Sequence, residues 1–363
     1  MISQDEAFAR IRLLRSPNVG PVSFRQLMRR FGTAVEALEA LPDLAAKGGA
    51  KYRAAPRERI ETEIAAVRRA GARYLFHDSP DYPPMLAESE SAPPVLTVRG
   101  DAGLAAKPCI AMVGARNASA AAMRLARDLA AELAGEGFTI VSGLARGIDG
   151  AAHRGALPAT VGVIASGIDI AYPPQHADLQ EEIAQGGFLV AEQPAGTEPR
   201  GSHFPSRNRI IAGLALGTLV VEAAPKSGSL ITARLAGEYG REVMAIPGSP
   251  LDARSHGCNQ LIREGAILIQ SAADVIELVS SFGGGMSSRL RSSGQDLFEA
   301  QPAAPEAEDE DDIAALLTIA PVAVDELIRQ SGASAASVQM ALLELELAGR
   351  LERHAGGRVS VAA

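Results

Sequence analysis

The stretch from residue 204 to residue 248 carries side chains that could bind phosphate groups. Two arginines, Arg207 and Arg209, stand at the start of an apolar, helix-like segment. The polar loop KSGS (226–229) follows the apolar run TLVVEA (218–223) and precedes a second helix-like segment. Such a loop presents backbone N–H groups and a helix N-terminus to an anion at the carboxyl end of a strand. A glycine loop alone is weak evidence, since many unrelated folds contain one, but the loop and the arginines together favour a phosphate-binding edge. The candidate residues of this stretch are Arg207, Asn208, Arg209, Lys226, Ser227, Gly228 and Ser229.

Arginine also follows two apolar runs earlier in the chain. The segment VGARN (113–117) contains one glycine and one arginine, and SGLARGID (142–149) contains two glycines and one arginine. The glycines let a ligand approach the backbone closely, and the arginines supply fixed positive charge. The three glycines of a dinucleotide-binding loop are missing, so the chain does not match that fingerprint. The candidate residues are Gly114, Arg116, Ser142, Gly143, Arg146 and Gly147.

The sequence holds few candidates for catalysis or metal binding. Asp149 and His153 lie four residues apart and therefore on one face of a predicted helix. They could form a catalytic dyad, but no nucleophile accompanies them; we favour the alternative in which Asp149 caps the helix and His153 is a hydrogen-bonded structural residue. Cys109 and Cys258 lack ligand spacing, so we expect neither a zinc site nor a disulfide framework. We also expect no cofactor and no metal. Several arginines around glycine-rich loops fit a binder of phosphodiesters or nucleotides better than a hydrolase.

The segments that position these residues alternate between strand-like and helix-like runs. Short apolar strands are typical of a parallel sheet covered on both faces. The alternation predicts an α/β fold with a doubly wound, mainly parallel sheet. A Pro-rich connector, 73–101, precedes it and contains a possible edge strand at 95–98. The predicted strands are 110–113, 138–142, 160–165, 188–191, 218–222, 242–246 and 266–269. The predicted helices are 120–134, 150–156, 177–185, 207–216, 230–239, 259–263 and 273–280.

Two smaller modules flank this central domain, which we place at residues 73–280. Residues 1–72 predict a helix, a glycine-containing hairpin and a helix, which resembles SAM-like and helix-hairpin-helix modules; a structural helical cap is the alternative. Residues 281–312 are rich in Gly, Ser, Pro and acids, which predicts a flexible acidic linker. Residues 313–363 predict three helices and a β-hairpin, as in a winged helix, a module that contacts proteins as well as DNA. Its basic and acidic side chains nearly balance, so we favour a protein contact.

Composition excludes several broad classes of protein. The chain has 47% hydrophobic residues, only 4% aromatic residues and no Trp, which fits an α/β core rich in Ala, Val and Leu. Its net charge of −8 excludes a uniformly basic nucleic-acid coat protein, although residues 1–75 carry more basic than acidic side chains. No apolar run reaches the length of a membrane span, and the first residues lack the apolar segment of a signal peptide. We therefore expect a soluble cytoplasmic protein.

Six motifs occur in a fixed order over about two hundred residues. They are VGAR (113–116), SGLARGID (142–149) with His153, YPP (172–174), FPSRNR (204–209), SGSLITA (227–233) and PG (247–248). Together they resemble the DNA-processing protein A (DprA/Smf) family. The resemblance is dense over residues 73–270 and looser in the flanking modules.

This resemblance implies an extended Rossmann-like domain that binds single-stranded DNA, forms a homodimer and catalyses no reaction. It also implies that the protein helps to load RecA recombinase on incoming DNA during natural transformation. By position, Arg116 would be the main phosphate ligand and Phe204 would stack on a base, with residues 207–209 supporting the pocket wall. Many members carry lysine where this chain has Pro174 and Gly201. Arg200 or Lys226 could replace the missing charge.

Two other interpretations remain open. The architecture also resembles Rossmann-like phosphoribohydrolases of the lysine-decarboxylase-like group, which are enzymes that cleave nucleoside monophosphates and carry a PGGxGTxxE signature. The corresponding loop here is APKSGS (224–229), with no Glu in the first turn of the following helix. The third interpretation is a protein-interaction scaffold that uses the two helical ends and binds no nucleic acid.

Overall fold

The computed structural model describes residues 2–89, 91–280, 310–354 and 356–362, of which 310–312 by their backbone alone. These residues pack as two compact units. The larger unit is Glu63–Gln295, and the smaller unit combines Met1–Thr62 with Asp296–Ala363. Helix α4 (Arg57–Arg69) passes from the smaller unit into the larger one.

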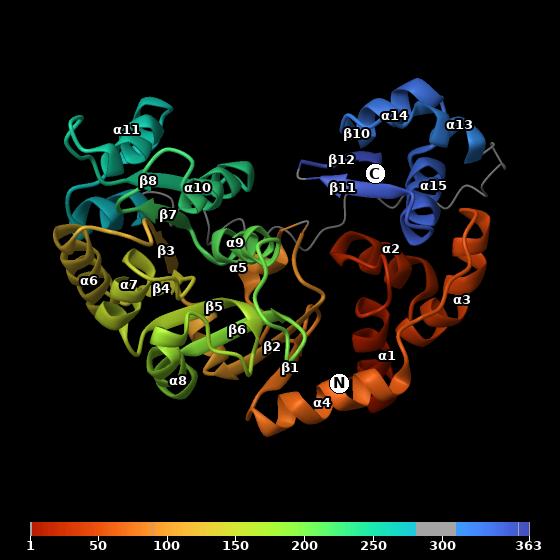
Figure 1. The fold of residues 1–363 in the computed structure, drawn as a ribbon, viewed down its shortest axis with the longest axis horizontal. Helices are drawn as coiled ribbons and strands as arrows, with labels where there is room; N and C mark the ends of the chain where they lie inside the picture. Colours follow the sequence, from red (N-terminus) through yellow and green to blue (C-terminus); the bar gives the residue numbers. More distant parts are fainter. Residues whose placement is uncertain (1, 90, 281–309, 355, 363) are drawn as a thin grey trace. The chain divides into compact units, whose positions relative to one another are not determined.

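The larger unit is built on a nine-stranded sheet with the order β1-β2-β6-β5-β4-β3-β7-β8-β9 (Figure 1). Strands β3 to β9 are parallel to one another, whereas β2 pairs antiparallel with both β1 and β6. The chain winds outward from β3 in one direction and from β7 in the other, so the loops after these central strands diverge. A ligand-binding crevice forms at such a point in open α/β sheets. The strands are β1 (Arg73–Phe76), β2 (Val95–Gly100), β3 (Cys109–Val113), β4 (Thr139–Ser142), β5 (Thr160–Gly167), β6 (Phe188–Gln193), β7 (Gly217–Val220), β8 (Glu242–Ala245) and β9 (Ile267–Leu268).

Helices cover both faces of this sheet because successive strand residues point to opposite sides. In β3, Ala111 and Val113 join one apolar core, and Ile110 and Met112 join the other. The first core also takes residues from α5, α9, α10 and α11, and the second takes residues from α6, α7 and the helical segment 272–280. The helices are α5 (Pro84–Ala87), η1 (Ala102–Ala106), α6 (Ala120–Gly135), α7 (Ile148–Ala156), η2 (Pro174–His176), α8 (Ala177–Gly186), α9 (His203–Leu214), α10 (Gly228–Glu238), η3 (Ala253–Ser255) and α11 (His256–Arg263).

The predicted α/β fold with its mainly parallel, doubly wound sheet is confirmed. The predicted edge strand at 95–98 exists as β2, but it lies inside the sheet, because β1 pairs along its outer side. Strand β1 was not predicted. Its four residues, RYLF, are too few to show an alternating pattern, and a basic residue begins them. The predicted linker at 281–312 falls almost wholly outside the described residues.

The smaller unit packs N-terminal helices against a winged-helix module. Leu343 and Leu347 of α15 share an apolar core with residues of α1, α2 and α3, among them Leu27 and Leu41. The Asn18 side chain, in the turn before α2, donates a 3.1 Å hydrogen bond to the Leu347 carbonyl oxygen. The elements are α1 (Gln4–Leu14), α2 (Pro21–Phe31), α3 (Ala34–Lys47), α13 (Glu310–Leu316), β10 (Val322–Ala323), α14 (Val324–Ser331), α15 (Ala335–Leu347), β11 (Leu351–His354) and β12 (Arg358–Val361).

Helix α15 is buried on nearly every side, as expected of a helix that is apolar all round. Glu344 is 1% exposed, and neither carboxylate oxygen has a hydrogen-bond partner among the described residues. Its nearest cation is the Lys47 ammonium group on α3, at 3.7 Å. This helix therefore serves as an internal contact of the smaller unit.

Membrane insertion by a helix has no support in the described residues. None of the helices resolved there combines the length and the apolar character that spanning a bilayer requires.

Candidate nucleic-acid interface

A small cavity of about 40 Å³ opens at the carboxyl edge of the central strands. Its walls come from the loops after β3 and β4, from the end of β5 and the loop that follows it, and from the first turns of α9. Because the carboxyl ends of parallel strands meet at one edge, residues far apart in sequence converge here. The lining residues are Arg116, Gly143, Ala145, Arg146, Ala165, Tyr172, Pro173, Phe204 and Arg207.

Aromatic rings and a guanidinium group stack beside this cavity. The Arg116 guanidinium carbon lies 4.8 Å from the centroid of the Phe204 ring. The Tyr172 ring lies 5.7 Å from the same ring, tilted by 54°. Phe204 is only partly buried and Arg116 is exposed. A π surface and a positive charge therefore stand side by side, which suits one base and its phosphate.

The loop after β4 is held in an unusual backbone conformation. Leu144 has φ 55°, and Gly147 has φ 75° with ψ −123°, a region open only to glycine. The Asp149 carboxylate accepts hydrogen bonds from the backbone N–H groups of Gly143 (3.2 Å) and Ala145 (3.4 Å). Asp149 thus clamps the loop, while Gly147 occupies the cap position of α7. The prediction that Asp149 caps its own helix was wrong, because its carboxylate is turned back towards the preceding loop.

His153 takes no part in a dyad. The Thr160 hydroxyl donates to the Ile140 carbonyl oxygen, so its oxygen accepts the Nδ1–H of His153 at 2.7 Å. His153 is completely buried. This residue ties α7 to β5, in agreement with the structural alternative for it.

Arg207 is a buried cation that faces the small cavity. It is 6% exposed, its Nη1 donates a long hydrogen bond of 3.4 Å to the Val163 carbonyl oxygen, and its Nε has no partner among the described residues. Burial lowers the pKa of the guanidinium to about 10, although the nearby Asp149 carboxylate acts in the opposite direction. Burial also raises the pKa of Asp149. An anion in the cavity would offset the cost of burying this charge.

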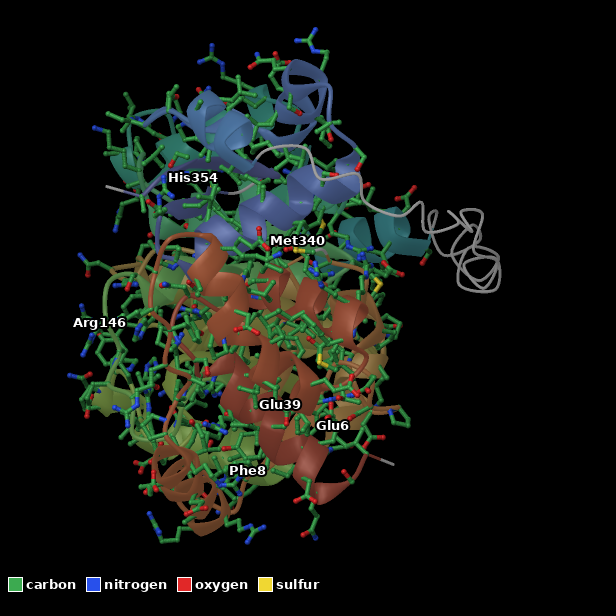
Figure 2. All side chains as sticks on the ribbon, turned by 90° about the vertical axis from the view of Figure 1, so that its right-hand side faces the viewer. Glu6, Phe8, Glu39, Arg146, Met340 and His354 are labelled. Atoms are coloured by element: carbon green, nitrogen blue, oxygen red, sulfur yellow. The ribbon has the colours of Figure 1, made fainter. Side chains whose placement is uncertain are left out.

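Several other predicted residues support the edge without lining the small cavity. The Ser142 hydroxyl donates to the Met112 carbonyl oxygen at 2.6 Å and is buried. A Cβ on Gly114 would lie 2.5 Å from Ile148, so this glycine permits close packing of α7. Gly147 lines a neighbouring, larger cavity. Arg146 lines the small cavity, and Figure 2 shows its side chain extending outward.

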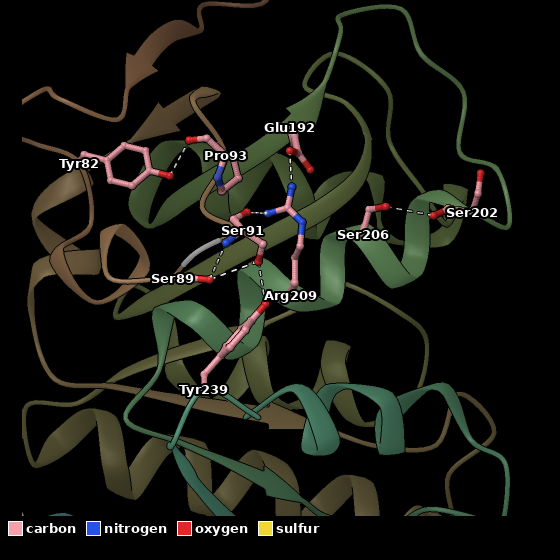
Figure 3. A network of polar contacts seen from close by, with 9 residues as sticks. All are labelled: Tyr82, Ser89, Ser91, Pro93, Glu192, Ser202, Ser206, Arg209 and Tyr239. Atoms are coloured by element: carbon pink, nitrogen blue, oxygen red, sulfur yellow. Dashed lines mark hydrogen bonds and ion pairs between the residues drawn. The ribbon is translucent and has the colours of Figure 1, made fainter. Parts of the chain in front are cut away.

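The remaining predicted residues do not reach the small cavity. Arg209 pairs with Glu192 and donates to the Ser91 carbonyl oxygen, as Figure 3 shows. Asn208 donates to the Gly228 carbonyl oxygen at 3.3 Å and so connects α9 with the 226–229 loop. In that loop Ser227 caps α10, Ser229 is buried, and Lys226 and Gly228 are exposed. These residues position the elements around the site.

The site has backbone N–H donors that could bind an oxyanion such as phosphate. Among the described residues, the backbone N–H groups of Arg146 and Gly147 have no hydrogen-bond acceptor. Arg116, Arg146 and Arg207 line the small cavity that this loop borders. No group of three His, Cys, Asp or Glu side chains that could hold a metal occurs within the described ranges. The arrangement can bind phosphate and stack on a base.

Comparison with protein families agrees with the order of the modules. Residues 73–280 match the model described as DNA recombination-mediator protein A, which spans more than half of the chain. Residues 4–66 match the DprA-like N-terminal HHH domain, and residues 299–357 match the DprA winged helix domain. The chain belongs to the DNA recombination-mediator protein A family.

Relatives within this family cover different shares of the chain. Protein Smf of Escherichia coli is 37% identical over 84% of this chain and 81% of its own length. Protein Smf of Synechocystis is 44% identical over 55% of this chain, which covers 52% of that protein. The DNA processing protein DprA of Streptococcus pneumoniae is 45% identical over 54% of this chain and 70% of its own length.

Solved structures of family members share the fold. The X-ray structure of DprA from Streptococcus pneumoniae superposes with a TM-score of 0.64 and 35% identity, over 76% of this chain and 98% of that one. DNA processing protein A from Helicobacter pylori, whose structure concerns its single-stranded DNA binding mode, has a TM-score of 0.53 and 30% identity, over 58% of this chain and 98% of that one.

Tyr172 forms part of the site, although it was not among the residues predicted to bind DNA. Tyr172 lies in the YPP motif, yet only the motif's place in the order was used. Its ring contacts Phe204 and lines the small cavity. An exposed aromatic residue beside prolines, in a loop after a buried strand, was the available signal.

Proposed function

We propose that this protein binds single-stranded DNA at the small cavity and acts in DNA processing for recombination during natural transformation. The observation that carries the proposal is the buried Arg207 guanidinium, which faces a cavity flanked by Arg116 and Phe204. Family membership supports it, as do the names of the relatives and the single-stranded DNA binding described for the Helicobacter pylori protein.

The chemistry of the site explains a preference for single strands. Arg116, Arg207 and the backbone N–H groups of Arg146 and Gly147 hold phosphate oxygens. The partly exposed Phe204 ring stacks on a base, which contributes about 1–3 kcal/mol with little sequence preference. A duplex keeps its bases paired and stacked, so its bases cannot turn onto the ring. The site therefore binds backbone and one π face, with no base-specific hydrogen bonds required.

Two partners complete the proposal. The family resemblance points to RecA recombinase, which this protein would help to load onto the bound strand without catalysing a reaction itself. It also points to a homodimer. RecA loading is measured as faster filament assembly on single-stranded DNA that is already coated with single-strand-binding protein. Unchanged assembly rates at saturating amounts of this protein would remove RecA from the proposal.

The DNA site is tested by fluorescence anisotropy of labelled oligo(dT) at several salt concentrations. Arg116→Ala should weaken binding to every sequence and reduce the salt slope by about 0.7, the value for one phosphate contact of a single strand. Phe204→Ala should weaken binding with nearly the same slope as wild type. Lys107→Ala is the matched control, because Lys107 is exposed and precedes β3 at the opposite end of the strands. Wild-type binding by Arg116→Ala at every salt concentration would show that the site lies elsewhere.

A further inference from the structure

A second, larger cavity of about 540 Å³ lies beside the small one. Residues of α6, α7 and η2 line it, together with Gly147 from the loop that also carries Arg146. Arg146 lines the small cavity and Gly147 lines the large one, so adjacent residues of one loop border both. We name the large cavity the arginine cleft. Its lining residues are Met123, Arg124, Arg127, Asp128, Gly147, Ala151, Arg154 and His176.

Glycines bring the walls of the arginine cleft together. A Cβ on Gly155 would lie 2.1 Å from the Arg127 carbonyl oxygen, so α7 touches the backbone of α6 at this point. A Cβ on Gly150 would lie 2.5 Å from Cε1 of His176. No real Cβ tolerates such distances, and the close approach of the two helices and of His176 depends on these glycines. The cleft is thus a defined feature of the packed domain.

The charge of the arginine cleft is positive and unbalanced. Arg124, Arg127 and Arg154 are exposed, and no ion pair joins any of them to an acid within the described residues. Arg154 makes one long contact, of 3.4 Å, to the Gly150 carbonyl oxygen within the part of the chain that the structure describes. Asp128 is the one acid in the lining. Three arginines and one acid in the lining give this cleft a net positive charge, which favours an anionic ligand.

His176 links the cleft to the loop after β4. Its Nδ1–H donates to the Leu144 carbonyl oxygen at 2.8 Å, and its side chain is buried. This bond holds η2 against that loop and so fixes one wall of the cleft. Because Leu144 belongs to the loop clamped by Asp149, the same loop geometry shapes both cavities.

We propose that the arginine cleft is a second phosphate-binding segment, along which the DNA strand held in the small cavity continues past Arg146 and Gly147. The cleft is too large for a single phosphate and presents cations from two helices, which suits successive phosphates of one chain. Met123, 36% exposed, gives an apolar contact for a sugar or base. The proposal rests on the proposed function, because it extends that DNA site.

The test compares oligo(dT) of increasing length against the full chain and the double variant Arg124→Ala/Arg154→Ala. The short probe is the shortest oligonucleotide whose affinity falls in Arg116→Ala. The double variant should bind this probe as wild type does and should bind longer probes more weakly, by roughly fivefold at 0.1 M salt for each phosphate that it no longer neutralises. Its salt slope for long probes should fall by about 0.7 for each such phosphate. Arg124→Lys/Arg154→Lys should keep most of the slope, and Lys107→Ala should behave as wild type.

The outcomes of this test separate the inference from the proposed function. If Arg116→Ala loses affinity and the double variant matches wild type at every length, the inference fails alone. If the double variant loses as much affinity with the short probe as with long ones, the cleft is no continuation and the inference also fails. If Arg116→Ala binds normally while the double variant loses long-probe binding, the phosphate segment stands and the small cavity is misassigned. Saturable binding of free dTMP, blocked by the double variant, would overturn the inference in favour of a mononucleotide site.

Discussion

At the scale of single residues, Gly143 and Arg207 depend on each other. A Cβ added to Gly143 would lie 1.2 Å from Nη1 of Arg207, a distance at which one of the two must move. The guanidinium is buried against β5, so its open direction is the small cavity. The glycine therefore preserves the space in which a phosphate would meet this cation.

Gly143→Ala should reduce affinity for single-stranded DNA by at least tenfold, because the displaced guanidinium would fill the cavity. The measurement is oligo(dT) anisotropy, with the thermal unfolding midpoint recorded in parallel. Gly135→Ala is the control, since a Cβ there meets no atom within 4 Å. Wild-type affinity in Gly143→Ala would mean that Arg207 has no part in binding.

At the scale of elements, a few polar bonds position α7 and α9 against the sheet. His153 joins α7 to Thr160 of β5, and Asn208 joins α9 to the loop before α10. Asp149, at the start of α7, holds the loop after β4. Because His153 and Asp149 are buried, the protonation state of each side chain affects the free energy of unfolding.

His153 should make the protein less stable in mild acid. Burial lowers the pKa of His153 to about 3, whereas an unfolded histidine titrates near 6.5. The unfolded state therefore binds a proton that the folded state does not, and stability falls as pH decreases from about 6.5 towards about 3. The slope is at most about 1.4 kcal/mol per pH unit for one proton. Urea unfolding across this range should show a shallower pH dependence in His153→Gln; identical dependence in both proteins would exclude His153 as the cause.

At the scale of the whole molecule, the smaller unit depends on both ends of the chain. Leu343 and Leu347 from α15 complete the core of the N-terminal helices. The helix that a winged helix normally offers to DNA is buried here by protein contacts. This contact lies within the chain, so binding of a partner protein by the C-terminal module stays a prediction.

A chain shortened to residues 1–280 should keep its affinity for single-stranded DNA within about tenfold, equivalent to about 1.4 kcal/mol. Its N-terminal helices should lose stability because their core loses α15. Hydrogen exchange should therefore accelerate in residues 4–47 and stay unchanged in residues 109–280. Leu347→Ala in the full chain is the matched variant and should cost about 2–5 kcal/mol. A larger loss of DNA affinity would show that the C-terminal module binds DNA directly.

The exposed edge strand β9 is the proposed dimer interface. Ile267 and Leu268 are 36% and 44% exposed, and an edge strand leaves backbone hydrogen-bonding groups open to pairing. Leu268→Lys should shift the full chain from dimer to monomer in sedimentation velocity at micromolar concentration. Ile319→Lys is the control, because Ile319 is an equally apolar exposed residue, 86% exposed, of the smaller unit. A wild-type chain that sediments only as monomer would refute the dimer.

The sequence by itself determined the doubly wound sheet and the approximate place of the site. Apolar strands that alternate with helices usually form a parallel sheet covered by helices on both faces, and the carboxyl ends of such strands meet at one edge. Arg116 and Arg146 follow strands, so their convergence could be predicted. Strand β1 could not be predicted, because four residues are too few to show the alternation of apolar and polar side chains. Their extended conformation depends on pairing with β2.

Only the tertiary structure decided which side chains face the cavity. Residues 207, 208 and 209 are adjacent in sequence, but successive residues of a helix point about 100° apart. Arg207 therefore faces the cavity, Asn208 reaches the neighbouring loop, and Arg209 pairs with Glu192. The position of Tyr172 and the existence of the arginine cleft could not be predicted from the sequence either, because a loop's path and the packing of two helices depend on contacts between distant residues. The sequence states which residues are present. The rotation of each helix about its own axis, relative to the sheet, determines which of them can contact a ligand.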